Sequence, residues 1–386
     1  MQLKKSLVRI TTVPISLDKL LEDQLRFMNQ YYNVIAVSSN ETDLKKVGVK
    51  EGVETYCVEM TRKITPFKDV ISVLKLVVYF LKHRPEIVHT HTPKAGIVGM
   101  LAARITNVPI RLHTVAGLPL LEVNGIKRRI LNYVEKLTYR CAHRVYPNSF
   151  GLKEIIEEEK FTKPSKLKVI GNGSSNGIDT SYFSRESIKN EIIDKLRQRL
   201  NIKEEDFVFV FVGRIVGDKG INELVESFNE LKIKYNNMKL LLVGPFEEDL
   251  DPIAQSSKAI IKESENIITT GYVNDVRPYY AISDVLVFPS YREGFPNVVM
   301  QAGAMGLPSI VSNINGCNEI ITHNINGSII RVKNAPDLFL EMESYVMDRE
   351  KFTRIKSNAR KCIVKNYERS FFHNALLEEY KTLNHV

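Results

Sequence analysis

The chain has 386 residues, more than one hydrophobic core usually supports, so we expect two domains. With 44% hydrophobic and 26% charged residues it has the composition of a globular protein, which excludes a disordered or collagen-like chain. The formal net charge of +9 is uneven: residues 1–170 carry 28 Lys and Arg against 16 Asp and Glu, which leaves 26 against 29 for the remainder. We therefore expect an anionic partner on the first half of the chain.

The cysteines and the apolar segments favour a cytoplasmic protein without a membrane span. The four cysteines lie far apart and form no CxxC pair, which argues against a disulfide framework or a zinc site: Cys57, Cys141, Cys317 and Cys362. The N-terminus has no apolar stretch long enough for a signal peptide. The most apolar segment, VISVLKLVVYFL (70–81), has twelve residues where a bilayer span needs roughly 20, so we expect a buried helix.

Short apolar runs alternate with segments of helical period along the first half. The predicted strands are 8–13, 33–38, 55–60, 87–92, 110–115, 144–148 and 167–171. The predicted helices are 18–30, 68–83, 95–106, 127–141 and 150–160. Apolar strands separated by helices indicate a parallel sheet that is covered on both faces.

A Gly-, Ser- and Asn-rich stretch, GNGSSNGIDTSYFSRESIKN (171–190), then interrupts the alternation and suits a linker. After a helix near 187–200, the predicted strands are 207–213, 239–243, 267–271, 285–288, 309–312 and 328–332. Two Rossmann-like halves joined by a linker explain this order. The first turn, TTVPISLDKL, has no glycine where a dinucleotide-binding dehydrogenase needs GxGxxG, so that class is disfavoured.

The segment FVGRIVGDKGINELVESF (211–228) predicts an anion site. A buried strand ends at Gly213, a loop carries Arg214 and Lys219, and a helix begins near Ile221. Cations at the carboxyl end of a parallel strand, beside a helix N-terminus, suit a pyrophosphate. A solvated basic loop is the alternative, but this strand–loop–helix context favours the anion site.

The segment SYREGFPNVVMQAGAMGLPSIVSN (290–313) predicts a second part of the same site. Pro296 suits the first turn of a helix and Gly306 its stop. The amides of Asn297 and Val298 would then point at an anion. Glu293, in the loop before this helix, could accept hydrogen bonds from sugar hydroxyls.

These stretches, with HTHTPKAG (89–96), RLHTVAGLP (111–119), GNGSSNGIDTSYF (171–183) and TGYVNDVRPYYAISDVLVFPSYREGFPNVVMQAGAMGLP (270–308), resemble the retaining glycosyltransferases of family 4. The resemblance extends over nearly the whole chain and is to bacterial capsule and O-antigen enzymes. It implies an α/β fold of the GT-B type, with two Rossmann-like domains facing each other across a cleft. The expected parts are an acceptor-binding domain (1–172), a linker (173–190) and a donor-binding domain (191–365), with a C-terminal helix (366–386) packed back onto the first domain.

The resemblance also implies roles for single residues. Arg214 and Lys219 would hold the donor diphosphate, Glu293 would contact the transferred sugar, and His113 would face that sugar from the first domain. The remaining donor-binding residues implied are Gly213, Tyr272, Val273, Phe295, Asn297, Val298 and Gln301. His91 and Lys94 are weaker candidates for the acceptor site, with packing or exposure to solvent as the alternative.

The chain departs from the family pattern at two places. Gln301 stands where the family usually has a second glutamate, which typically bonds the donor ribose; Gln keeps an acceptor oxygen and loses the charge. The N-terminal glycine-rich turn of the family is missing, so the resemblance does not define phosphate and acceptor contacts from residues 14–20.

We expect neither a metal nor another cofactor. Asp249 and Asp251 are spaced like a DxD metal motif, but they lie in an acidic loop that we expect to be solvated. Cations and helix amides can neutralise the charge that builds on a leaving diphosphate, so Arg214 and Lys219 would replace a metal. The diphosphate oxygen could then help to deprotonate the acceptor on the front face.

The expected function is transfer of a hexose or N-acetylhexosamine from a nucleotide sugar, with UDP-sugar favoured, to a lipid-linked or glycan acceptor of a surface polysaccharide. The basic segment 126–144 suits docking on an anionic membrane, at its inner face; the other interpretation of this segment is a helix with one buried face and one solvated basic face. No nucleic-acid partner is expected. Two alternatives stay open: a UDP-sugar 2-epimerase of the same architecture, and a non-catalytic protein that binds nucleotide sugars.

Overall fold

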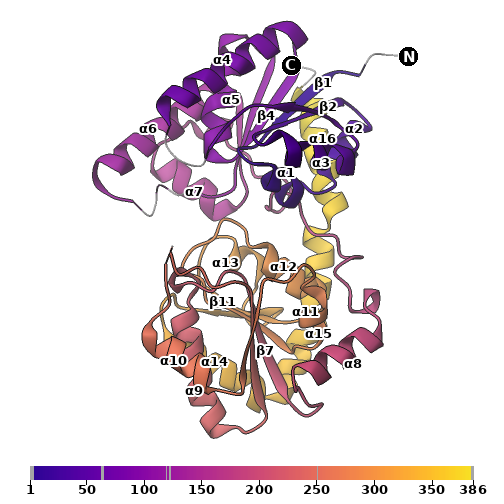
Figure 1. The fold of residues 1–386 in the computed structure, drawn as a ribbon, viewed down its shortest axis with the longest axis vertical. Coiled ribbons are helices and arrows are strands. Elements are labelled where there is room, and N and C mark those ends of the chain that lie inside the picture. The colour runs from indigo at the N-terminus through magenta and orange to yellow at the C-terminus, as the bar shows by residue number, and fades with distance from the viewer. Residues whose placement is uncertain (1–3, 62–64, 119, 121–122, 250, 384–386) are drawn as a thin grey trace. The chain divides into compact units, whose positions relative to one another are not determined.

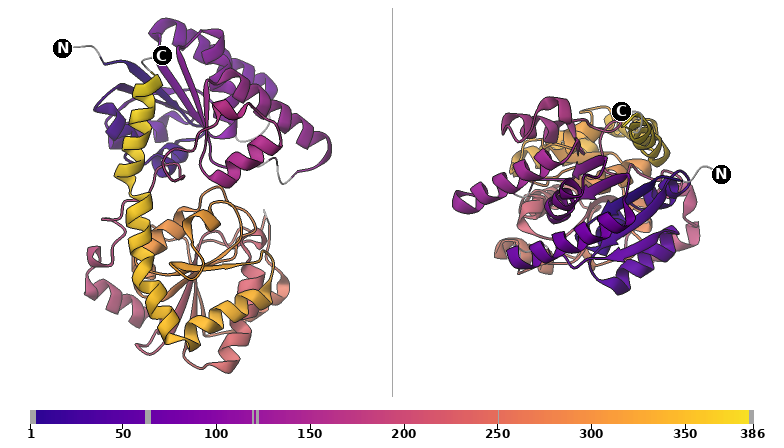
Figure 2. Two further views of the ribbon diagram at one scale, coloured as in Figure 1. Left: turned by 180° about the vertical axis from the view of Figure 1, so that it is seen from behind. Right: turned by 90° about the horizontal axis from the view of Figure 1, so that it is seen from above.

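The computed structural model describes residues 4–61, 65–118, 120, 123–249 and 251–383. The chain divides into two compact units, shown in Figures 1 and 2. Unit 1 comprises Met1–Gly177 and Ser370–Val386, and unit 2 comprises Ile178–Arg369. The expected linker does not form a separate element, because Ile178, Phe183 and Ile188 are buried in the core of unit 2.

Unit 1 contains a six-stranded parallel sheet in the order β3-β2-β1-β4-β5-β6. Its strands are β1 (Ser6–Ile10), β2 (Asn33–Ser38), β3 (Glu54–Cys57), β4 (Ile87–His91), β5 (Ile110–Val115) and β6 (Arg144–Pro147). In register, Val8 of β1 lies opposite Ile35 of β2 and Val88 of β4. The apolar runs are buried because helices cover both faces of the sheet.

The helices of unit 1 are α1 (Pro14–Leu20), α2 (Gln24–Asn29), α3 (Glu41–Glu51), α4 (Pro66–His83), α5 (Pro93–Ile105), α6 (Gly125–Cys141), α7 (Phe150–Glu158) and α16 (Arg369–Leu383). The predicted single helix 18–30 is two helices, because Asp23 adopts a left-handed conformation with φ 61°. Residues 167–171 form no strand; a single bridge joins Leu167 to Val145. The sequence reasoning missed α3, whose buried Leu44, Val47 and Gly48 have helical spacing.

The prediction that 70–81 is a buried helix is wrong for one side of α4. Leu76 and Phe80 are buried against the core of unit 1. Five apolar side chains of the same segment are exposed: Val70, Ile71, Leu74, Val78 and Leu81. Apolar residues on both sides of the helix raise its overall hydropathy, but only one side packs against the core of unit 1.

Unit 2 repeats the architecture, with the strand order β12-β11-β10-β7-β8-β9, all parallel. Its strands are β7 (Phe207–Val212), β8 (Met238–Val243), β9 (Ile267–Gly271), β10 (Val285–Phe288), β11 (Ser309–Ser312) and β12 (Gly327–Ile330). Its helices are α8 (Asn190–Arg199), α9 (Ile221–Lys234), α10 (Gln255–Glu263), α11 (Arg277–Ala281), α12 (Asn297–Ala304), α13 (Cys317–Ile320), α14 (Ala335–Met347) and α15 (Arg349–Tyr367). Because all strands run the same way, the loops after them lie at one edge of the sheet.

Candidate functional site

The loops after β7 and β8 touch at two glycines. A Cβ atom on Gly244 would lie 1.8 Å from the carbonyl oxygen of Gly213, so only glycine fits there. This approach brings Arg214 beside Glu247, and Arg214 Nη1 lies 2.9 Å from Glu247 Oε2. The Arg214 side chain is 44% exposed, so the cation stands at the carboxyl edge of the sheet within reach of solvent.

Lys219 is brought to the loop after β10. It ends a short 3₁₀ turn (Gly217–Lys219), and Gly220 follows with φ 71°. A Cβ on Gly220 would lie 2.2 Å from the carbonyl oxygen of Pro289, so the turn is pressed against the end of β10. Lys219 Nζ lies 2.5 Å from Glu293 Oε1, and the two side chains are 15% and 18% exposed. The structure therefore joins two of the predicted site residues directly.

The Glu293 loop is held by residues that the sequence reasoning missed. Ser290 Oγ donates a hydrogen bond to Glu293 Oε1 (3.2 Å), and Asn315 Nδ2 donates to the Glu293 carbonyl (2.6 Å). Asn315 belongs to an Asn-Gly pair after β11, a turn signal that could have indicated a loop packed at this edge. Lys219, Ser290 and Asn315, which lie in the loops after β7, β10 and β11, thus fix the position of Glu293.

Helix α12 directs its first amides to the same edge. Its first hydrogen bond runs from the Val299 amide to the Pro296 carbonyl (3.2 Å), so the amides of Asn297 and Val298 precede the helix ladder. The positive end of the helix dipole adds to them. Pro296, which was predicted to lie in the first turn, is instead the N-cap residue just before the helix, and Gly306 with φ 89° follows the end of the helix.

The remaining predicted donor-site residues of unit 2 have different surroundings. Tyr272, just after β9, is 74% exposed, whereas Val273 packs partly against the core. Phe295 is buried, with its ring centroid 5.6 Å from that of Tyr367. Gln301 Oε1 accepts a hydrogen bond from the Tyr280 hydroxyl (3.3 Å).

Carboxylates accompany the cations along this edge. Besides the Arg214–Glu247 and Lys219–Glu293 pairs, Arg292 Nη2 lies 2.6 Å from Asp218 Oδ2. An anionic ligand must therefore compete with carboxylates for its cations. Asp249 and Asp251 are exposed, as predicted, and Asp251 also accepts a hydrogen bond from the Asp218 amide (2.6 Å), which caps the 3₁₀ turn; the intervening residue 250 lies outside the described part of the chain.

His113 of unit 1 is buried in β5. Its Nδ1 lies 2.8 Å from Thr90 Oγ1, and a Cβ on Gly96 would lie 2.5 Å from its Cε1, so Gly96 makes room for the ring. Burial lowers the pKa of His113 to about 4, which makes the imidazole neutral at pH 7.

His91 and Lys94 both have protein partners. His91 Nε2 lies 2.9 Å from Arg9 Nη2, and Arg9 Nη1 donates to the Tyr380 hydroxyl of α16 (2.9 Å). Lys94 Nζ lies 2.5 Å from Asp69 Oδ2. The structure thus places His91 in a buried network that ties α16 to the sheet.

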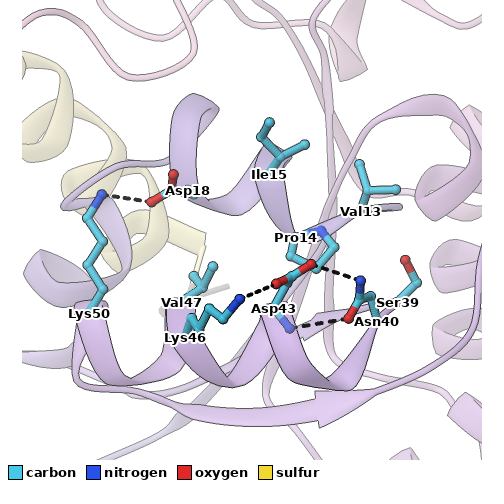
Figure 3. Close-up of a pocket in the computed structure, with 10 residues that line it drawn as sticks. All are labelled: Val13, Pro14, Ile15, Asp18, Ser39, Asn40, Asp43, Lys46, Val47 and Lys50. Carbon is cyan, nitrogen blue, oxygen red and sulfur yellow. Dashed lines mark hydrogen bonds and ion pairs between the residues drawn. The ribbon is translucent and has the colours of Figure 1, made fainter. Parts of the chain in front are cut away.

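A cavity of about 580 Å³ opens between α1 and α3 (Figure 3). Its lining includes Pro14, Ile15 and Asp18, which belong to the segment whose phosphate and acceptor contacts the family resemblance does not define. Its apolar lining is Val13, Pro14, Ile15 and Val47. Its charged groups form two ion pairs, Asp18–Lys50 and Asp43–Lys46, each at 2.7 Å. The pocket begins directly after β1 and β2, at the carboxyl edge of the unit 1 sheet.

Comparison with known proteins decides the family. One family model, described as glycosyl transferases group 1, matches residues 192–362, and another, a glycosyl transferase 4-like domain, matches residues 32–173. The capsular polysaccharide biosynthesis glycosyltransferase CapM of Staphylococcus aureus is 34% identical over 364 residues, which is 94% of this chain and 93% of CapM. The chain belongs to the family 4 glycosyltransferases.

Two further proteins are similar to this glycosyltransferase, one in sequence and one in structure. An Escherichia coli UDP-Gal:alpha-D-GlcNAc-diphosphoundecaprenol alpha-1,3-galactosyltransferase is 31% identical over 82% of the chain and 79% of its own length. The crystal structure of Anabaena Alr3699/HepE with UDP and glucose superposes with a TM-score of 0.81 at 17% identity, over 98% of this chain and all of that one. The predicted GT-B fold and the predicted enzyme class are confirmed.

Proposed function

We propose that this glycosyltransferase transfers a hexose or N-acetylhexosamine from a UDP-sugar to a lipid-linked or glycan acceptor in surface polysaccharide biosynthesis, with retention of configuration. The observation that carries the proposal is the Lys219–Glu293 pair at the edge where Arg214 and the first amides of α12 also lie. Cations and amides at this edge suit a diphosphate, and a fixed carboxylate suits sugar hydroxyls.

Breaking the bond between sugar and diphosphate leaves negative charge on the departing oxygen. Arg214, Lys219 and the amides of Asn297 and Val298 would stabilise that charge, which lowers the barrier without a metal ion. Glu293 would bind the transferred sugar, held in place by Ser290 and Asn315. The departing diphosphate oxygen would take the proton of the attacking acceptor hydroxyl on the same face of the sugar, so the configuration is retained.

The relatives support the donor and the acceptor class. The name of the Escherichia coli relative specifies UDP-galactose as donor and a diphosphoundecaprenol-linked sugar as acceptor, and the HepE crystal contains UDP. CapM is named for capsular polysaccharide biosynthesis. A lipid-linked acceptor would bring this enzyme to the inner face of the cell membrane as a peripheral protein.

His113 stays a candidate for the donor sugar, in its neutral form. Its ring is buried within unit 1, so a hydrogen bond to a hydroxyl would have to replace the bond to Thr90 or use Nε2. The pocket of Figure 3 offers apolar walls and paired charges to a neutral sugar of the acceptor.

The test is turnover by the purified protein with a panel of UDP-sugars and polyprenyl-diphosphate-linked sugars, in the presence of EDTA. We expect one donor to be consumed and its sugar to appear on the lipid with the donor's anomeric configuration by NMR. An inverted product would contradict retention, loss of activity in EDTA would contradict the metal-free mechanism, and an epimerised free nucleotide sugar would favour the epimerase.

A further inference from the structure

Helix α4 presents an unusual exposed surface. Phe67 is 90% exposed, and it begins a row of large apolar side chains on one side of the helix. The row consists of Phe67, Val70, Ile71, Leu74, Val78 and Leu81. Their spacing of three or four residues places them along one stripe, which we call the α4 stripe.

The α4 stripe is not needed to hold the helix on its unit. The opposite side of α4 does that through Ser72, Leu76 and Phe80, which are buried. The Ser72 hydroxyl donates to the carbonyl of Glu59 (2.6 Å), and Leu76 and Phe80 belong to the core next to α5. Single exposed apolar residues are common, but a contiguous row of six indicates a surface with a partner.

The charges around the stripe are positive. Lys68, Lys75 and Lys82 of α4 are exposed. The acidic residue of this helix, Asp69, pairs with Lys94. An apolar row bordered by lysines has the composition of a helix that lies in a bilayer interface.

Helix α6 adds a second basic surface on the same side of the sheet. Both α4 and α6 pack against α5, and Figures 1 and 2 show the three helices together on one face of the unit 1 sheet. The exposed cations of α6 are Lys127, Arg129, Lys136 and Arg140, and its exposed apolar residues are Ile126, Ile130 and Tyr133. Glu135, the acid of this helix, is buried.

We propose that the α4 stripe inserts into the headgroup–acyl boundary of an anionic lipid bilayer, with the basic residues of α6 at the headgroups. The function proposed above supplies the reason, because a lipid-linked acceptor lies in that bilayer. Within the described residues, no helix is long and apolar enough to cross a membrane, so the stripe would lie in the interface. A second copy of this chain is a poorer partner, because it would bring lysines against lysines.

A tryptophan in the stripe gives a direct test, because the chain contains no tryptophan of its own. Leu74→Trp should show a blue shift of emission when vesicles containing phosphatidylglycerol are added to the full-length protein, and quenching by brominated acyl chains. Vesicles of phosphatidylcholine alone should give a much smaller shift. Ile233→Trp, at an exposed position of α9 in unit 2, should show neither effect.

A pair of substitutions tests the energetics. Leu74→Glu with Val78→Glu should weaken binding to anionic vesicles at least tenfold, while transfer to a water-soluble acceptor analogue stays at the wild-type rate. The control, Val49→Glu with Ile233→Glu, adds the same charge at exposed positions of α3 and α9 and should bind within about twofold of wild type.

Three results would overturn the proposal: vesicle binding with no shift at Leu74→Trp, no binding to anionic vesicles, or a shift that rises with protein concentration in the absence of lipid. The last would assign the stripe to a second copy. The function proposed above fails separately, because UDP-sugar turnover on a soluble acceptor is measured without any vesicle.

Discussion

Lys219 and Glu293 form an ion pair of 2.5 Å although 74 positions separate them in the chain. The pair exists because β7 and β10 are neighbours in the sheet and both end at the same edge. It links the residue proposed to hold the diphosphate to the residue proposed to hold the sugar, so a change in one should affect the position of the other.

Lys219→Ala should lower kcat by roughly 10²–10³-fold, the usual effect of removing one stabilising group from a developing negative charge. It should also lower the free energy of unfolding by about 1–3 kcal/mol, because Glu293 is left mostly buried without its cation.

Arg214→Ala should reduce turnover with little loss of stability, because its ion pair is largely exposed. Steady-state rates and urea unfolding measure both effects. Arg331→Ala, which breaks an exposed pair with Asp337, is the control, and a wild-type rate in either site variant would remove that residue from the mechanism.

Glu247→Gln should tighten the binding of UDP severalfold. Without a ligand, Glu247 forms an ion pair with Arg214, and a diphosphate must displace the Glu247 carboxylate to bind Arg214. A glutamine side chain at this position competes less well with the diphosphate because it has no charge. Isothermal titration with UDP gives the affinity, and the gain should shrink at high salt. Weaker binding would instead mean that Glu247 contacts the nucleotide.

Gln301→Glu should leave the fold unchanged and tighten donor binding by about 1 kcal/mol, or about fivefold, because hydrogen bonds to a charged acceptor are stronger. The Tyr280 hydroxyl that donates to Gln301 can donate to a carboxylate equally well. The measurement is the KM for the donor sugar nucleotide. An unchanged KM would show that this position does not contact the ribose in this enzyme.

Glu135→Gln should remove a pH dependence of stability. Burial raises the pKa of Glu135 to about 7 from its ordinary 4.5, so the folded protein holds a proton that the unfolded chain releases. The wild type therefore loses stability as the pH rises from about 4.5 to about 7, by at most roughly 3 kcal/mol, and the loss remains above pH 7.

The Glu135→Gln variant should therefore match the wild type near pH 4.5 and be more stable than it at pH 8. His113, with its pKa lowered to about 4, adds a dependence of the opposite sign, but this is common to both proteins and cancels in the difference. Urea unfolding at both pH values measures the difference in the free energy of unfolding between the two proteins, and Glu154→Gln, at an exposed position, is the control. Equal stability of the two proteins at pH 8 would contradict the prediction.

The sequence predicted the strands most accurately, since a fully buried strand is a continuous apolar run. The predicted limits of β2, β5, β10 and β11 coincide with the observed ones, as do those of β9, which is only partly buried. Helix α4 shows the limit of this reasoning, because hydropathy counts apolar residues without showing which of them pack. The break between α1 and α2 depends on one backbone angle at Asp23, which composition does not reveal.

At the candidate site, the sequence identified residue types and missed their partners. Arg214, Lys219 and Glu293 were predicted because each stands beside a turn at the end of a strand. Glu247 was missed because it lies in an acidic run, and its contact with Arg214 depends on the close approach of Gly213 and Gly244. Such contacts follow from strand order, which local sequence does not encode.

The network around Arg9 makes unit 1 discontinuous along the chain. Arg9 bonds Tyr380, and His89 also reaches the Tyr380 hydroxyl (2.5 Å), so β1 and β4 find partners in the last helix. During synthesis, all of unit 2 is made before Tyr380, because the segment that returns to unit 1 begins only at Ser370. The core of unit 1 therefore cannot be completed until the end of the chain has been synthesised, although most of its residues are made first.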